Sequence, residues 1–384
     1  MQRFPAFQLT LLAILYGWTI TFATCAENAI PPAESKFPPS AQAAPANPDA
    51  VPQANPPKPH IALILPLKSE SFGTAAEITR QGFIAGAAAG QGGSRLPVKT
   101  YATTEQTDEI LATYQLALAA GAQVVVGPLT RDGVSALAVS GMVHVPTLAL
   151  NVPENFPVLP AYMFTFSLQV ENETRQIAML AKQDGKREAL IIGTDTLLDK
   201  RMQQAFAVEW EKLGGVILKS LFFTGEQDGL LTLKQAVEIS GADMVFLALD
   251  AKKARQVRPY IDSSVSIYAT SQIFSGNNQG TLNFDLNGIR FVDMPWLLQS
   301  DHPAVMVYPR PKSAVFVDLE RLYALGIDAY RITQDLSALG PRSGYALDGV
   351  TGQISLNPDH QFVRELTPAV FYQGHAIVLY ESKR

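Results

Sequence analysis

The chain has 384 residues, of which 47% are hydrophobic and 17% charged, and its 30 Lys and Arg against 35 Asp and Glu give a net charge of −5. This length allows two or three domains with substantial cores, and a mildly acidic chain without a basic block is a poor candidate for binding nucleic acid. A single Cys excludes an internal disulfide framework, and together with five scattered His it leaves little material for a zinc site.

The first 26 residues have the layout of a secretory signal peptide. Arg3 gives a positive start, residues 9–22 form a mostly apolar run, and small residues follow at 23–26. The apolar run is shorter than the ~20 residues that a membrane span needs. We therefore expect export with a cleaved signal over residues 1–26 rather than a membrane anchor.

The single cysteine, Cys25, stands where a bacterial lipoprotein carries its lipid. The residues before it only resemble a lipobox, because Thr24 occupies a position where Gly, Ala or Ser is usual. Cleavage after Ala26 without any lipid is the alternative. The predicted location is the periplasm, with an anchor in the outer membrane if Cys25 is lipidated.

Residues 27–59 form a linker rich in Pro and Ala. Ten Pro and seven Ala fall between positions 31 and 59, and such a composition cannot bury apolar surface and favours extended, polyproline-like conformations. We expect a disordered tether, which at ~3.1 Å per residue would reach on the order of 90 Å. A leader with no task beyond spacing is the other interpretation.

From His60 onward, predicted strands and helices alternate. Residues 60–66 are a short, continuous apolar run ended by proline, which is typical of a strand buried on both faces. In this first part the pattern predicts strands at 60–66, 97–101, 123–127, 145–150 and 161–166, and helices at 69–89, 105–119 and 130–139. The rhythm then restarts with predicted helices at 171–182, 197–213 and 230–240, and strands at 188–193, 216–223, 243–249 and 266–270. Such alternation predicts an α/β fold with two doubly wound, parallel-sheet lobes.

The last hundred residues are expected to complete the first lobe. Residues 288–296 have the pattern of a crossing back, 314–325 of a helix, and 340–358 of a hairpin. The expected boundaries are therefore 60–168 plus 296–384 for lobe one, and 169–295 for lobe two. Trp296 is interpreted either as packing against this crossing, the favoured alternative, or as an exposed anchor for a partner.

The two-lobed layout resembles the type I periplasmic binding-protein fold, and a set of short sequence pieces allows a closer comparison. These pieces are Val126-Gly-Pro-Leu129, residues 145–151, Phe166-Ser-Leu168 with Glu171 and Glu173, residues 205–215, Ala269-Thr-Ser271, residues 290–298, residues 321–330 and Gly349-Val-Thr-Gly352. In this order, over about residues 60–380, they resemble the LppC/LpoA-like family of penicillin-binding protein activator lipoproteins. The pieces at 290–298 and 321–330 are the most specific.

The resemblance implies a partner rather than a reaction. Members of the family bind a class A penicillin-binding protein from the outer-membrane side and stimulate peptidoglycan synthesis. Larger members carry a helical-repeat domain ahead of this part, and here the proline-rich leader stands in that place. The implied function is thus regulation of peptidoglycan synthesis, and the alternative from the two-lobed layout is a periplasmic solute-binding protein of a transport system.

Ligands of open α/β sheets bind at the carboxyl ends of the strands, where loops and helix N-termini converge. A cleft for a small polar ligand would then be lined by Leu67, Ser69, Phe72, Gly127, Pro128, Leu129, Thr130, Asn151, Thr194, Asp195 and Ser271. A purely structural interpretation has equal weight, with residues 127–128 as a tight turn and Ser69 and Asn151 satisfying local backbone groups. Amino-acid-binding members of the fold usually present hydroxyl residues where this chain has Leu129 and Asn151, so an amino-acid ligand is disfavoured.

Enzyme signatures are absent from the sequence. It contains no G-x-S-x-G elbow, no H-E-x-x-H and no phosphate-binding G-x-x-x-x-G-K-[ST]. We therefore expect no catalytic residue, no metal ligand and no cofactor, and a hydrolase is the least favoured hypothesis.

Overall fold

The computed structural model describes residues 57–90, 96–154, 158–277, 280–311, 316–339 and 344–379. The expected signal peptide, Cys25 and the linker up to residue 56 lie outside these residues. Residues 56–384 group into one compact unit. Within the described residues, no helix is long and apolar enough to cross a membrane.

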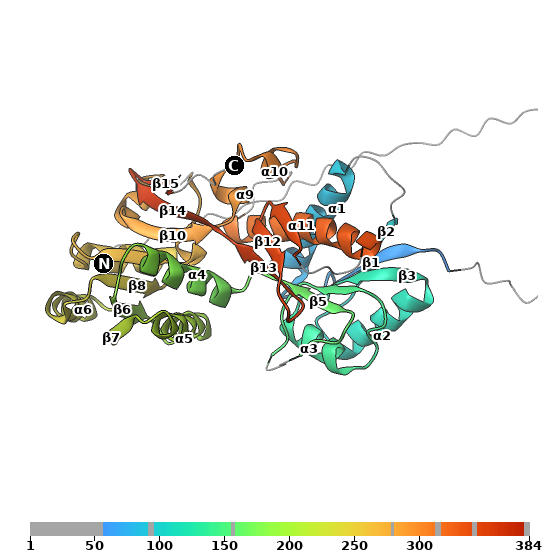
Figure 1. Ribbon diagram of the computed structural model, residues 1–384, viewed down its shortest axis with the longest axis horizontal. Coiled ribbons are helices and arrows are strands. Elements are labelled where there is room, and N and C mark those ends of the chain that lie inside the picture. Colours follow the sequence, from blue (N-terminus) through green and yellow to red (C-terminus); the bar gives the residue numbers. More distant parts are fainter. Residues whose placement is uncertain are drawn as a thin grey trace, which may run out of the picture. The chain divides into compact units, whose positions relative to one another are not determined.

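An eight-stranded sheet organises the first half of the fold, in the order β11-β12-β13-β5-β4-β3-β1-β2 (Figure 1). Pairing is parallel from β2 through to β13, and β13, β12 and β11 are joined antiparallel. Every residue of β1, which lies between β3 and the edge strand β2, is buried, as a run that is apolar on both faces requires. The strands are β1 (His60–Leu65), β2 (Val98–Ala102), β3 (Ala122–Val126), β4 (Thr147–Ala149), β5 (Met163–Phe166), β11 (Ala346–Gly349), β12 (Gly352–Leu356) and β13 (Gln361–Glu365).

Helices pack on both faces of this sheet. One face forms an apolar cluster with two of the helices, α1 (Gly73–Ala89) and α11 (Val317–Leu339). The other face forms a second cluster with α2 (Thr107–Ala119) and α3 (Arg131–Val139).

A seven-stranded sheet organises the second half, in the order β15-β14-β10-β9-β8-β6-β7. Pairing is parallel from β7 through β6, β8 and β9 to β10; β14 is added antiparallel to β10, and β15 antiparallel to β14 (Figure 1). One face packs against α4 (Val170–Gln183) and α5 (Leu197–Lys212), and the other against α6 (Gln227–Ser240) and α7 (Ala251–Val257). The strands are β6 (Glu188–Gly193), β7 (Val216–Phe222), β8 (Met244–Ala248), β9 (Ser266–Ala269), β10 (Ile289–Asp293), β14 (Thr367–Tyr372) and β15 (His375–Val378).

The two mostly parallel α/β sheets confirm the fold class expected from the sequence. The apolar cluster beneath α4 and α5 continues through the crossing after β10 to α11, so one core joins both halves. Trp296, the second residue of the short helix α9 (Pro295–Leu298), is fully buried in that core and stacks obliquely on Tyr323. Of the two interpretations of Trp296, the structure shows packing in the core and not an exposed anchor.

The C-terminal strands differ from the expected boundaries. We expected all of residues 296–384 to join the first lobe, but β14 pairs with β10 of the second sheet and β15 pairs with β14. Alternation with a period of two residues predicts a strand, but it does not determine with which strand or sheet that strand will pair. The boundary between lobes in this segment remains a proposal.

Glycines let α1 and α11 approach each other closely. A Cβ on Gly82 would overlap the carbonyl oxygen of Tyr323, and a Cβ on Gly326 would overlap the carbonyl oxygen of Thr79. The helices therefore touch backbone to backbone at these two positions. Gly326 lies inside the 321–330 piece, so packing accounts for part of that motif.

Candidate functional site

The first predicted cleft residues lie in the loop between β1 and α1. The hydroxyl of Ser69 accepts a hydrogen bond from the backbone N–H of Phe72 at 2.9 Å, and Leu67 and Phe72 are partly exposed. Next to Ser69, Lys68 forms an ion pair of 2.9 Å with Glu109 of α2. The loop is thus held both by its own turn and by the neighbouring helix.

The acidity of Glu109 gives a pH test of this loop. Hydrogen bonds from the hydroxyl and backbone N–H of Thr104, with the Lys68 ammonium, lower the pKa of Glu109 from 4.5 to about 2. Because the carboxylate is favoured in the folded state, it contributes stability above the unfolded pKa, and this is lost as the pH falls from about 4.5 towards 2.

We expect Glu109→Gln to flatten this acid-side loss of stability. The melting temperature of the variant and of the parent, measured between pH 6 and pH 3, should converge as the pH falls. A constant difference across that range would contradict the role of Glu109.

The second group of predicted residues surrounds the end of β3. Gly127 has a φ of +105°, and a Cβ there would overlap the carbonyl oxygen of Ile64 in β1, so only glycine fits. The side-chain amide of Asn151 donates to the carbonyl of Leu129 at 3.0 Å, and the N–H of Leu150 donates to the carbonyl of Pro128 at 2.9 Å. The hydroxyl of Thr130 caps α3. The structure brings these predicted residues together, and their polar groups bind one another.

Among the predicted residues of the second half, Thr194 also has a partner within the chain. The hydroxyl of Thr194 donates to the buried carboxylate of Asp199, whose other neighbour is Lys253 at 3.7 Å. Lys253 in turn pairs with Asp250 at 3.0 Å. Asp195 is exposed. Between these residues and the predicted set of the first half, no hydrogen bond or ion pair is found in the described part of the chain.

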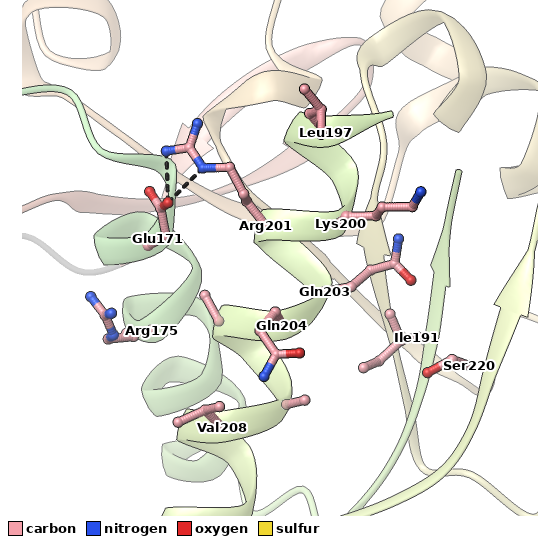
Figure 2. Close-up of a pocket in the computed structure, with 12 residues that line it drawn as sticks. Glu171, Arg175, Ile191, Leu197, Lys200, Arg201, Gln203, Gln204, Val208 and Ser220 are labelled. Carbon is pink, nitrogen blue, oxygen red and sulfur yellow. Dashed lines mark hydrogen bonds and ion pairs between the residues drawn. The ribbon is translucent and has the colours of Figure 1, made fainter. Parts of the chain in front are cut away.

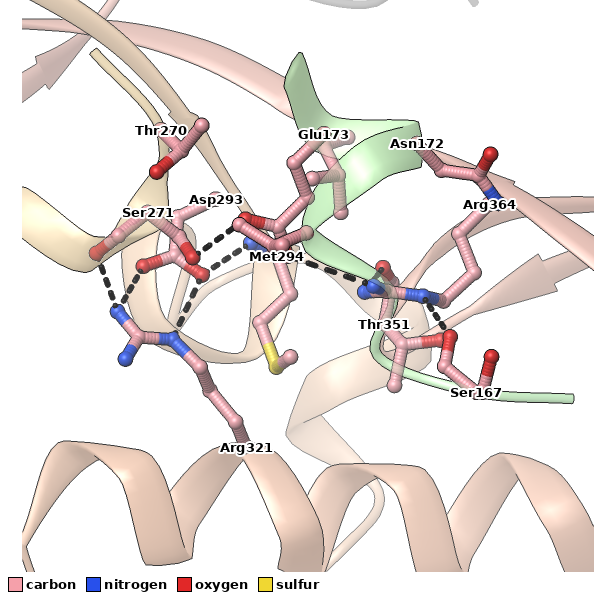
Figure 3. Close-up of polar contacts among 12 residues, drawn as sticks. Ser167, Asn172, Glu173, Thr270, Ser271, Asp293, Met294, Arg321, Thr351 and Arg364 are labelled. Atoms are coloured by element: carbon pink, nitrogen blue, oxygen red, sulfur yellow. Dashed lines mark hydrogen bonds and ion pairs between the residues drawn. The ribbon is translucent and has the colours of Figure 1, made fainter. Parts of the chain in front are cut away.

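Ser271 belongs to a different feature, a buried network of charges where the chain passes between the two sheets (Figure 3). Its hydroxyl donates to Glu173 of α4 at 2.6 Å, and its carbonyl accepts from Arg321 of α11 at 2.9 Å. Arg321 also pairs with Asp293, the last residue of β10, at 2.6 Å. On the other side, Glu173 lies 3.5 Å from Arg364 of β13.

This charge network touches all three chain crossings. Glu173 follows the crossing from β5 to α4, Asp293 precedes the crossing to α9, and Arg364 precedes the crossing to β14. The guanidinium of Arg364 also donates to the carbonyls of Ser167 and Thr351, at 3.2 and 3.4 Å. Buried charges are tolerated when they are paired and hydrogen-bonded, as these are. The network therefore ties the crossings to one another.

The burial of these groups shifts their pKa values. Burial raises the pKa of the Glu173 carboxyl, and the opposing effects of Arg364 and Ser271 do not cancel it. Burial also lowers the pKa of Arg364. For Arg321 burial opposes the charge, but the carboxylates of Asp293 and Asp318 outweigh it and raise the pKa.

Sequence reasoning assigned Ser271 to a ligand cleft and missed the network around it. Two periodic signals could have revealed it. Glu173 lies three residues after buried Val170 and four before buried Ile177, on the apolar face of α4. Arg364 alternates in phase with buried Phe362 in β13. A charged residue in phase with a buried face indicates a buried pair.

The pockets formed by described residues include the following three. The first, of about 760 Å³, lies along α4 and α5 (Figure 2). The second, of about 490 Å³, lies between α4 and β13, and the third, of about 330 Å³, lies near α9 and β14. None of the eleven predicted cleft residues lines any of these three pockets.

Comparison with known proteins identifies the family. The family model described as "LppC putative lipoprotein" matches residues 36–374. The chain belongs to the LppC lipoprotein family. A family of lipoproteins implies a location in the cell envelope.

The similar curated proteins of this LppC chain are distant and longer. "Penicillin-binding protein activator LpoA" of Pectobacterium parmentieri is 28% identical over 328 residues, covering 74% of this chain and 48% of that protein. The protein of the same name from Pantoea ananatis is 27% identical, with the same coverage. The chain thus spans about half the length of the curated relatives it matches.

Solved structures give the fold of this LppC chain. The C-domain of LpoA from Haemophilus influenzae, described as a regulator of PBP1A, superposes with a TM-score of 0.72 at 23% identity, covering 84% of this chain and all of that one. A "putative branched-chain amino acid ABC transporter" from Chromobacterium violaceum is 38% identical, with a TM-score of 0.68, covering 82% of this chain and all of that one. The fold is that of the type I periplasmic binding proteins.

The most specific sequence pieces of this LppC chain are structural. Residues 290–298 contain Asp293 and Trp296, and residues 321–330 contain Arg321 and Gly326. These residues form the crossing network, the shared core and the contact between α1 and α11. These two pieces therefore help to hold the two halves together, and neither contains a residue of the predicted cleft.

Proposed function

We propose that this protein is exported to the cell envelope, binds a class A penicillin-binding protein and activates it, and thereby regulates peptidoglycan synthesis. The support is membership of the LppC family and similarity to proteins named penicillin-binding protein activators. Because the chain spans only about half the length of those relatives, the identity of its partner is itself proposed and not taken over from them.

The observation that carries the proposal is that polar side chains of the predicted cleft already bond groups of the protein itself. The polar side chains of Asn151, Thr194 and Ser271 are each bonded within the protein. The crossings on which opening and closing of two lobes would depend are tied by buried ion pairs. A body of this kind acts through its surface, by binding, and the proposed activity needs neither catalysis nor a cofactor.

Location in the envelope follows from the family and from the N-terminal pattern. We propose that the chain is anchored to the outer membrane through lipid on Cys25, with a free periplasmic form as the alternative. Mass spectrometry of the mature N-terminus distinguishes the two, because a lipid-modified terminus begins at Cys25 and carries the added acyl mass. An unmodified terminus after Ala26 would contradict the anchor.

The direct test is binding between the purified mature protein and the periplasmic part of a class A penicillin-binding protein from the same organism. We expect saturable binding in biolayer interferometry with no metabolite added, and none to a monofunctional transpeptidase used as a control. Failure to bind at about 100 μM, a concentration far above the Kd of ordinary specific complexes, would contradict the proposal.

One observation favours a second candidate, a solute-binding protein. The C. violaceum structure is 38% identical and is described as a branched-chain amino acid transporter. That function predicts that leucine, isoleucine or valine raises the melting temperature, since a ligand at about 100 times its Kd adds about 2.7 kcal/mol of stability. Activation of a synthase predicts no shift with these amino acids.

A further inference from the structure

Strand β7 leaves one edge of the seven-stranded sheet uncovered by any other described strand. It pairs only with β6, and each of its seven residues is at least partly exposed, whereas β6 and β8 are mostly or wholly buried. Val216, Leu218 and Phe222 are 53%, 39% and 60% exposed. An exposed apolar edge strand is a template for pairing with another chain.

The backbone of this edge has free hydrogen-bonding groups. The N–H of Phe223 donates to the carbonyl of Gly193 in β6 at 2.9 Å, which fixes the direction of the ladder at this end. Because successive residues of a strand direct their N–H and C=O groups to opposite sides, those of Phe222 and Ser220 point away from β6. An extended segment lying beside β7 would meet them.

A positively charged pocket extends from this edge across α5 to α4 (Figure 2). The pocket of about 760 Å³ is lined by residues of α4 and α5 and includes Ser220 of β7 (Figure 2). Arg201 is neutralised by Glu171, with Nη2 2.6 Å from the carboxylate. Arg175 bonds only the side-chain amide oxygen of Asn172, and Lys200 has no acidic partner among the described residues. The pocket therefore has an excess of positive charge.

We propose that β7 and this pocket bind an extended, acidic segment of a partner protein as an added strand. The ladder would supply affinity, Phe222 and Leu218 apolar contacts, and Lys200 of α5 the preference for carboxylates. Arg175, on α4 across α5, would bind acidic residues where the segment continues past the added strand. A second copy of this chain is disfavoured, because two antiparallel β7 strands that pair over their full length would place Lys219 opposite its own copy. The inference deepens the proposed function by naming a binding surface. It rests on that function for one assumption, that the partner is a protein.

The test compares four forms of the mature protein in binding the periplasmic part of the class A synthase. Ser220→Pro removes an outward N–H, and the double variant R175E/K200E reverses the pocket charge. Lys252→Glu, an exposed lysine of α7 on the opposite face of the sheet, is the matched control. We expect binding at least about tenfold weaker in the first two variants and unchanged in the control. Equal binding by all four forms would show that this surface is not the binding site, and the proposed function would still stand.

If no form binds the synthase, the proposed function fails. A second measurement then tests whether β7 and the pocket bind an acidic strand at all. Hydrogen exchange is measured with and without an acidic strand-forming peptide of alternating Glu and Val. Added protection of the amides of Ser220 and Phe222 in the parent, lost in R175E/K200E, supports the surface. No protection, or equal protection by the Lys-Val counterpart, overturns it.

Discussion

Replacing Arg321 by methionine is expected to lower the free energy of unfolding by about 3–5 kcal/mol, the usual cost of removing one partner from a buried ion pair. The guanidinium lies 2.6 Å from Asp293 and also donates to the carbonyls of Ser271 and Phe274. Without it, the carboxylate of Asp293 and two backbone carbonyls lose their buried donor. Urea unfolding of the parent and the variant measures the difference.

Two further variants separate pairing from packing. Arg80→Met removes a surface pair with Glu77 on α1 and should cost no more than about 1 kcal/mol. The double variant R321M/D293L removes both charges and should recover part of the loss, because an apolar pair avoids the cost of an uncompensated charge, while the carbonyls of Ser271 and Phe274 still lack their donor. A loss below 1 kcal/mol for R321M, or a double variant no more stable than R321M, would contradict the role of the network.

Gly82→Ala is expected to be the next most damaging change, at about 1–3 kcal/mol, because it forces one methyl group into a packed contact. The new Cβ would overlap the backbone carbonyl of Tyr323, which cannot move without shifting α11. Since α11 carries Arg321, the shift should also loosen the crossing network. Thermal unfolding followed by circular dichroism measures the loss.

The matched control for this change is in the same helix. At Gly73, the first residue of α1, a Cβ would come only to 3.4 Å from the carbonyl of Leu67, an ordinary contact. Gly73→Ala should therefore be neutral, or stabilising by about 0.4–1 kcal/mol through the unfolded state. Equal losses for the two variants would show that close helix packing is not the cause.

Much of the fold could be predicted from the sequence, because continuous apolar strands and amphipathic helices are local signals. The buried run of β1 and the alternation of β6, α5 and β7 were identified within a few residues of their bounds. The partner of β14 could not be predicted, because pairing with β10 is decided by a contact between segments about 75 residues apart. The same limit applies to α11, whose C-terminal half was not recognised as a helix.

The candidate site was harder to predict than the fold. Position after a strand placed Leu129 and Asn151 in one group, but it did not show that the amide of Asn151 donates to the carbonyl of Leu129. Ser271 was placed by the same rule, and its actual partners, Glu173 and Arg321, come from distant parts of the chain. Long-range pairing of buried charges has only a weak local signal, the phase of a charged residue with an apolar face.

The most direct test of the account is the rate of peptidoglycan synthesis by a purified class A penicillin-binding protein from the same organism, measured with and without the mature protein. The account predicts a saturable increase in rate with no small molecule added, and a smaller increase with R175E/K200E than with Lys252→Glu. An unchanged rate at saturating concentrations of the folded protein would contradict it.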